Sequence, residues 1–184
     1  IAIQSGTSNE FSFMSEEERK NFFIPIFFCF SEYDKLFYKK RKINIGTFEI
    51  TGSVRSALSY EYIKSEKLKI NPNKYDICLI SESHPTLNGD YYQVRNLADS
   101  IGLVAEFTHK LCKKHNLNLI FTGDSDIREK ISMREIYFYK HYLKNNDFKI
   151  FQSDKANKYP SYVNIMQSKL TIGLVSTILR EAIS

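Results

Sequence analysis

The stretch that decides the fold lies near the end of the chain: Lys169–Val175 (KLTIGLV), followed by Ser176–Ser184 (STILREAIS). The first run is short, has β-branched residues and contains no polar side chain after Thr171. Such a run is typical of a strand buried on both faces, as in a parallel sheet. Ser176 and Thr177 then stand where a helix begins, because their hydroxyls are of the kind that cap free backbone N–H groups.

A strand that enters a helix through such a turn makes an anion site, since the first-turn N–H groups and the positive end of the helix dipole point outward together. Glu181 follows Thr177 by four residues, so it lies on the same helix face one turn further along. We therefore predict that Ser176 and Thr177 bind a diphosphate and that Glu181 accepts sugar hydroxyls. The alternative is that the Ser-Thr pair is only a helix cap and that the glutamate is only solvated.

Composition bounds the class of protein. The chain has 184 residues, 42% of them hydrophobic, and its net charge of +5 comes from 26 basic and 21 acidic residues mixed along the sequence. Mild basicity suits a phosphate-bearing ligand or an anionic membrane surface, but it is weak evidence for nucleic acid, which we do not expect as a partner. The apolar first residue and an end inside a predicted helix lead us to expect part of a longer polypeptide.

The cysteines and histidines argue against disulfides and metal sites. Cys29, Cys78 and Cys112 have no paired spacing, so we expect buried free thiols in a reducing compartment and a cytoplasmic protein. A peripheral contact with the inner face of the membrane stays open. The histidines make no metal-ligand spacing with cysteine or with each other. No apolar run reaches the length of a membrane span.

Strands and helices alternate regularly after Pro72. The pattern predicts strands near 76–81, 117–122, 148–152 and 170–175, and helices near 91–115, 131–143 and 159–166. Such an alternation predicts an α/β fold with a parallel sheet and helices on both faces, joined by right-handed crossovers.

The first part of the chain shows a similar but less regular pattern. We expect the end of a strand at 1–4, strands at 24–30 and 43–51 (the second open to a break at Gly46), and a helix capped by Ser31. The stretch 15–21 is either a solvated loop or a short helix. A polar connection at 59–74 is the best candidate for a domain boundary, which divides the chain into residues 1–70 and 75–184.

In order and spacing, these pieces resemble a bacterial glycosyltransferase family with the GT-B architecture, of the kind found in capsule and surface-carbohydrate gene clusters. The resemblance covers most of the chain. It rests on Ile3–Gly6 (IQSG), Phe28–Asp34 (FCFSEYD) leading into Tyr38, Thr51–Arg55 (TGSVR), Tyr75–Ser81 (YDICLIS), and Ser176-Thr177 followed by Glu181.

The resemblance implies two Rossmann-like domains that face each other across a cleft. Residues 1–70 would be the end of the acceptor-side domain, and residues 75–184 most of the domain that binds the nucleotide-sugar donor. Ser176 and Thr177 would approach the donor diphosphate, and Glu181 would take the ribose hydroxyls. The implied activity is transfer of a sugar from a nucleotide-sugar to a carbohydrate or lipid-linked acceptor, without metal and without a separate cofactor. The same placement of Ser or Gly and then Glu is found in sugar-nucleotide epimerases of similar fold.

Further candidate contacts follow the predicted strands at the edge where a parallel sheet binds ligands. Ser81, Ser83 and His84 come after the first strand of the second domain, and Thr122 and Gly123 end the next one. These residues could contact phosphate, base or ribose. The alternatives are an exposed loop at Ser81, Ser83 and His84 and a plain turn at Thr122 and Gly123, and loop histidines are more often merely exposed. Tyr159 precedes the last strand, where it either stacks on a base or covers the edge of the core.

Other catalytic signals are missing. The sequence has no Gly-x-Gly-x-x-Gly motif and no Gly-Lys-Ser/Thr phosphate loop, and we assign no catalytic residue. The Asp124-x-Asp126 pair resembles a glycosyltransferase metal motif, but we interpret it as a turn with a helix cap, so no metal is expected. The alternative function is a non-catalytic nucleotide-binding Rossmann-like module, or an epimerase-like enzyme.

Overall fold

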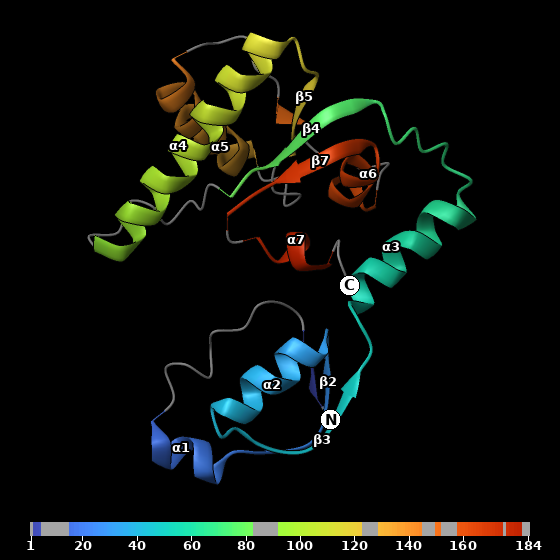
Figure 1. Ribbon diagram of the computed structural model, residues 1–184, viewed down its shortest axis with the longest axis vertical. Helices are drawn as coiled ribbons and strands as arrows, with labels where there is room; N and C mark the ends of the chain where they lie inside the picture. Colours follow the sequence, from blue (N-terminus) through green and yellow to red (C-terminus); the bar gives the residue numbers. More distant parts are fainter. Residues whose placement is uncertain are drawn as a thin grey trace. The chain divides into compact units, whose positions relative to one another are not determined.

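The computed structural model describes residues 2–4, 15–82, 92–122, 129–144, 150–151, 158–174 and 176–181. The chain divides into two compact units, which Figure 1 draws in the colours of the sequence. Unit 1 comprises Ile1–Glu61 and Arg180–Ser184, and unit 2 comprises Tyr62–Leu179.

Unit 1 is built on a parallel sheet in the order β1-β2-β3. Its elements are β1 (Ala2–Ile3), α1 (Glu16–Asn21), β2 (Phe23–Cys29), α2 (Glu32–Lys40), β3 (Asn44–Ile50) and the first part of α3 (Val54–Ser65). The predicted strands at 24–30 and 43–51 are confirmed, and residues 15–21 form the short helix rather than the loop.

Local sequence explains the helix starts of unit 1. Ser15 and Glu18 form a capping box at the start of α1, in which each side chain binds the other residue's backbone N–H. Ser31 caps α2 as predicted, because its hydroxyl accepts the N–H of Asp34 at 3.3 Å. The core below α2 joins Tyr38 to Phe27 through an edge-on ring contact at 5.0 Å.

The second strand, for which the sequence left a break at Gly46 open, is continuous, since β3 runs through this residue. A Cβ atom at position 46 would lie 2.8 Å from the carbonyl oxygen of Pro25 and 3.3 Å from the Phe23 ring. The glycine therefore permits the close approach of β2 rather than a bend.

Unit 2 contains a four-stranded sheet in the order β6-β5-β4-β7, and all of its described pairings are parallel. The elements that follow the end of α3 are β4 (Tyr75–Ile80), α4 (Tyr92–His115), β5 (Leu119–Thr122), α5 (Glu129–Leu143), β6 (Ile150–Phe151), α6 (Pro160–Met166), β7 (Ser168–Ile172) and the first part of α7 (Thr177–Glu181). The predicted α/β fold with a parallel sheet is confirmed.

Helices cover both faces of this sheet, as predicted. Leu79 and Phe121 pack with Ala105 of α4 and Tyr139 of α5 on one face. Cys78, Ile80 and Ile120 face the other way, where they pack with Ile165 of α6 and with Ile178 and Leu179 of α7. Successive side chains on a strand point to opposite faces, so β4 supplies both layers of the core.

The interpretation of the last strand as buried on both faces is wrong. β7 stands at an end of the described sheet, where it pairs with β4 alone. Leu170 consequently keeps 54% of its surface exposed. The strand also ends at Ile172, before the predicted limit at residue 175.

The predicted polar connection at 59–74 misses a helix. α3 extends to Ser65, and the Ser53 hydroxyl caps its start by accepting the N–H of Ser56 at 3.1 Å. The apolar residues of α3 do not gather on one face, which removed the periodic signal on which the sequence interpretation depended.

Candidate functional site

The loop after β7 binds an anion, and the anion belongs to the chain itself. The backbone N–H of Leu174 donates to both carboxylate oxygens of Glu82, at 3.0 and 2.8 Å. The N–H of Ser176 donates to Glu82 Oε1 at 2.5 Å. Because β4 and β7 are parallel neighbours, Glu82 just after β4 and the loop after β7 meet at the carboxyl edge of the sheet.

Gly173 allows this loop to close on the carboxylate. A Cβ atom at position 173 would lie 3.0 Å from Glu82 Oε1 and 2.8 Å from a methyl carbon of Leu179 in α7. Any other residue would push one of these two groups aside. The turn predicted from the sequence as an anion site therefore has the backbone geometry for one.

The space beside this carboxylate is small. Glu82, Tyr139, Gly173 and Leu174 border it together with apolar residues of β4 and α4. It has room for only about one water molecule. An external phosphate would therefore have to displace the Glu82 carboxylate from the N–H groups rather than bind next to it.

Glu181 lies in the same short helix as Thr177, and only 4% of its surface is exposed. The alternative that it is simply a solvated helix residue is therefore wrong. A buried carboxylate needs hydrogen bonds or a cation to offset its desolvation, so substitution at this position will affect stability as well as any ligand.

Ser81 is buried at the end of β4, with 8% of its surface exposed. Its hydroxyl makes no hydrogen bond to a described residue, although it lies close enough to the Tyr139 hydroxyl to act on the pKa of that group. The Tyr139 hydroxyl accepts the N–H of Glu82 at 3.3 Å. Burial raises the pKa of Tyr139 to about 12, so this phenol stays protonated at physiological pH.

Thr122 is 2% exposed and lies inside the layer between the sheet and α6. Its hydroxyl accepts a hydrogen bond from Asn164 Nδ2 at 3.2 Å and lies 3.3 Å from the Cys78 sulfur. Burial raises the pKa of the Cys78 thiol to about 11. We assign the Thr122 side chain to this structural network rather than to the ligand edge where the sequence had placed it.

Tyr159 packs in an aromatic group, as the core-edge interpretation predicts. Its ring lies 5.5 Å from that of Tyr62 and 6.2 Å from that of Tyr162, both measured between centroids. Ser83, His84 and Gly123 lie outside the described residues, as do Asp124 and Asp126.

Glu82 is not among the residues predicted from the sequence, although its neighbours Ser81, Ser83 and His84 are. The sequence did contain a signal for this residue. Glu82 is acidic and comes just after the buried strand β4, whose carboxyl end lies at the same edge of the sheet as the glycine-containing loop after β7. Backbone N–H groups carry no sequence signal of their own, so the pairing of this acid with the loop emerges only from the register of β4 and β7.

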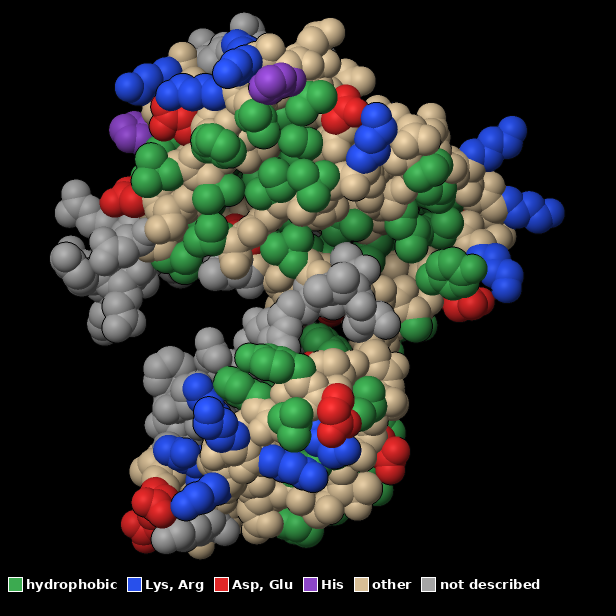
Figure 2. Space-filling view, viewed as in Figure 1, with side chains coloured by type: hydrophobic (Ala, Val, Ile, Leu, Met, Phe, Trp, Pro, Cys, Tyr) green, Lys and Arg blue, Asp and Glu red, His purple; other side chains and the backbone are tan. Residues whose placement is uncertain are grey.

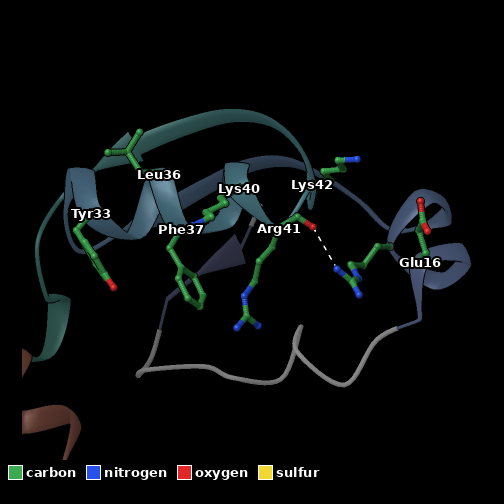
Figure 3. Close-up of a pocket in the computed structure, with 8 residues that line it drawn as sticks. Glu16, Tyr33, Leu36, Phe37, Lys40, Arg41 and Lys42 are labelled. Carbon is green, nitrogen blue, oxygen red and sulfur yellow. Dashed lines mark hydrogen bonds between the residues drawn. The ribbon is translucent and has the colours of Figure 1, made fainter.

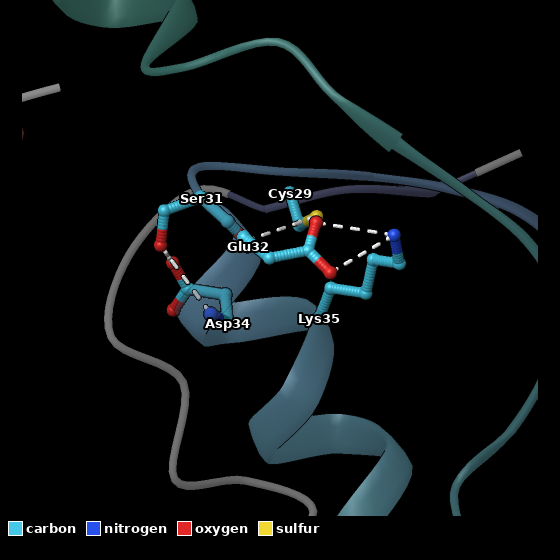
Figure 4. A network of polar contacts seen from close by, with 5 residues as sticks. All are labelled: Cys29, Ser31, Glu32, Asp34 and Lys35. Carbon is cyan, nitrogen blue, oxygen red and sulfur yellow. Dashed lines mark hydrogen bonds and ion pairs between the residues drawn. The ribbon is translucent and has the colours of Figure 1, made fainter.

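Unit 1 carries a comparable carboxylate. Asp34, near the start of α2, is 3% exposed. It accepts hydrogen bonds from Gln4 Nε2 at 3.2 Å and from the Ser31 hydroxyl at 2.6 Å. Figure 4 shows Ser31 and Asp34 beside Cys29, whose pKa is raised by burial and by the Asp34 charge. The exposed Glu32–Lys35 pair lies on the other side of the same helix turn.

Comparison of the chain with protein-family models, with curated proteins and with solved structures finds no match. No group of three or more His, Cys, Asp or Glu side chains among the described residues could hold a metal ion. The described part of the chain also contains no helix that is both long and apolar enough to cross a membrane. Cys29, Cys78 and Cys112 are free and buried, as predicted.

Proposed function

We propose that unit 2 binds a nucleoside diphosphate at the loop after β7, as the donor domain of a glycosyltransferase that uses a nucleotide-sugar. The observation that supports this is the set of hydrogen bonds from Leu174 and Ser176 to the Glu82 carboxylate. A loop that binds one oxyanion through backbone donors has the geometry to bind a phosphate, which offers the same kind of oxygen acceptors with more charge.

Glu82 acts as an internal competitor in this proposal. It occupies the N–H groups while no ligand is bound, and the diphosphate replaces it on binding. The hydroxyls of Ser176 and Thr177 stand at the same turn and would add donors. Glu181, one helical turn further along α7, is the proposed acceptor of the ribose hydroxyls. Because its carboxylate is buried and already has a partner, it would have to exchange that partner for the ribose.

The chemistry that such a site supplies is stabilisation of a departing diphosphate. Oriented N–H donors are most effective where negative charge develops during the reaction. In a glycosyltransferase this charge appears on the diphosphate oxygen as the bond to the sugar breaks. The acceptor would be a carbohydrate or a lipid-linked carbohydrate, and the protein would act in the cytoplasm or at the inner face of the membrane.

The test uses the full chain and calorimetric titration with UDP, GDP, CDP and ADP. Glu82→Gln keeps the side-chain shape and removes the competing charge, so the affinity for at least one of these diphosphates should rise by roughly tenfold, which corresponds to about 1.4 kcal/mol. The matched control is Glu106→Gln, which removes the same charge from an exposed ion pair with Lys110 on α4. It should leave the affinity unchanged.

Two results would overturn the proposal. One is that no diphosphate binds to either the unaltered chain or the Glu82→Gln variant. The other is equal diphosphate affinity in both, since a phosphate on these N–H groups must compete with Glu82. An assay of sugar transfer from a nucleotide-sugar would distinguish an enzyme from a non-catalytic binding module. In an enzyme that uses the loop after β7, the transfer rate should change in the Glu82→Gln variant.

A further inference from the structure

A second pocket lies in unit 1, along α2 and the turn that follows it (Figure 3). Its volume is about 920 Å³, within the range of roughly 300–1,000 Å³ that is usual for small-molecule sites. Residues of α1, of α2 and of the following turn line it: Glu16, Arg19, Tyr33, Leu36, Phe37, Lys40, Arg41 and Lys42.

The charge of this lining is strongly positive. Four basic side chains against one carboxylate give a net charge of +3 (4 − 1). The ammonium groups of Lys40 and Lys42 form no ion pair with any described residue. Figure 2 shows Lys and Arg side chains gathered on the part of unit 1 that contains α1 and α2.

Helix stabilisation alone does not explain this concentration of charge. Lys40 lies in the last turn of α2, where a cation interacts favourably with the helix dipole. Arg19 comes from a different helix, and its guanidinium donates to the carbonyl oxygen of Arg41 at 3.4 Å. Lys42 lies beyond the helix in a left-handed conformation with φ of 56°. Cations from α1, from α2 and from the following turn thus line one pocket.

Aromatic rings form the apolar wall of the same pocket. Tyr33 is 67% exposed, and its ring stacks on that of Phe37 with 6.4 Å between centroids and 26° between planes. The Arg41 guanidinium lies 4.4 Å from the centre of the Phe37 ring, an arrangement that orients the cation. Leu36 is also largely exposed. A flat ligand ring can therefore lie on Tyr33 while its charged group reaches the cations.

We propose that this pocket binds a small phosphate-bearing molecule whose sugar or base ring stacks on Tyr33. Phosphate satisfies several N–H donors at once, and arginine matches its geometry particularly well. Aromatic side chains stack on the face of a ligand ring and accept any base, because every base has such a face. This site is separate from the loop after β7 and does not depend on the function proposed for unit 2.

The experiment titrates the full chain with inorganic pyrophosphate, glucose 1-phosphate, UDP and uridine. Pyrophosphate should bind, more weakly at higher salt, and the double variant Lys40→Gln/Lys42→Gln should weaken its binding by roughly tenfold or more. Tyr33→Ala should lower the affinity for glucose 1-phosphate or UDP by roughly fivefold or more and leave the affinity for pyrophosphate unchanged. The preference between glucose 1-phosphate and UDP identifies the ring.

The matched control is Lys113→Gln/Lys114→Gln, which removes two exposed cations from the last turn of α4 and should change nothing. The proposal is overturned if pyrophosphate does not bind, or if the unit 1 variants leave all affinities at the values of the control. It is also overturned if Tyr33→Ala has no effect on either ring-bearing ligand. Because Glu82→Gln acts on the loop of unit 2, each site can fail while the other succeeds.

Discussion

Each sheet has, at its carboxyl edge, an acidic side chain that the chain itself hydrogen-bonds, but the two units do this differently. In unit 1 the donors to Asp34 include the side chains of Gln4 and Ser31, and Gln4 and Asp34 are both almost fully buried. In unit 2 the donors to Glu82 are backbone N–H groups of a loop, and Glu82 is only half-buried. The first is a closed structural network, whereas the second consists of backbone donors on a half-buried carboxylate, which we propose that a phosphate can replace.

The two units differ in the opposite sense in their pockets. Unit 1, whose carboxyl edge is closed by the Asp34 network, has the large basic pocket beside α2. Unit 2, whose loop has donors suited to phosphate, has room for only about one water molecule beside Glu82. An anion-binding geometry and an open pocket are therefore separate properties, and neither can be inferred from the other.

The largest effect should follow removal of the buried acid in unit 1. Asp34→Ala leaves Gln4 and Ser31 without this hydrogen-bond acceptor in a buried region, which should lower the free energy of unfolding by about 3 kcal/mol. Hydrogen exchange should locate the loss of protection in β2 and α2, because exchange reports each unit separately. Glu32→Ala is the control, since its partner Lys35 lies at the surface, and it should change stability by less than about 0.5 kcal/mol. Equal effects of the two variants would show that Asp34 is not a structural acid.

The packing of α4 on α5 offers a way to test whether unit 2 can lose stability while unit 1 keeps it. A Cβ atom at Gly102 of α4 would lie 2.4 Å from the ring of Tyr142 in α5, so Gly102→Ala should lower stability by about 2 kcal/mol. The sign is informative, because replacing glycine by alanine inside a helix otherwise stabilises it by about 1 kcal/mol. Exchange protection should fall in α4 and α5 and stay unchanged in β2. A stabilised variant would contradict the close packing of these helices.

The sequence predicted most of the fold because the signals were local. Leu79, Phe121 and Ala105 fall in strongly patterned segments, and the strands and helices around them follow the expected order. Helix α3 was missed because its apolar residues lack a common face, and β7 was taken for an interior strand because apolar content does not distinguish an end strand.

The candidate site could be predicted only in part, for a different physical reason. The turn at Ser176 was found from residue types that suit an anion-binding helix start. Its occupation by Glu82 depends on strand register, which brings together residues more than 90 positions apart. The pocket beside α2 combines α1 with α2, and neither helix alone has a sequence signal for a ligand.

The acid of unit 2 should be less important for stability than the acid of unit 1. Glu82→Gln retains an oxygen acceptor for the loop and loses only the charge, so it should lower the free energy of unfolding by about 1–2 kcal/mol. Denaturant unfolding followed by exchange in β4 and β7 measures this, with Glu106→Gln as the control. A loss equal to that of Asp34→Ala would remove the distinction between a structural and an exchangeable carboxylate.

The smallest effect concerns alkaline pH and the buried thiol of unit 2. Burial raises the pKa of Cys78 from 9.0 to about 11, so between these values the unfolded chain loses the thiol proton while the folded chain retains it. The stabilising contribution is therefore complete below about pH 9 and is lost as the pH rises toward 11. At pH 9.5 the loss should be somewhat less than about 1 kcal/mol, at 1.36 kcal/mol per unit of pKa difference.

Cys78→Ser keeps a donor near Thr122 and does not titrate, so the stability difference between it and the unaltered chain should shrink from pH 7.5 to pH 9.5. Protection of β4, read separately from that of β2, gives the measurement for unit 2 alone. A difference that stays constant over this range would mean that the Cys78 thiol ionises equally in both states, and the tight packing of the layer between the sheet and α6 would then be wrong.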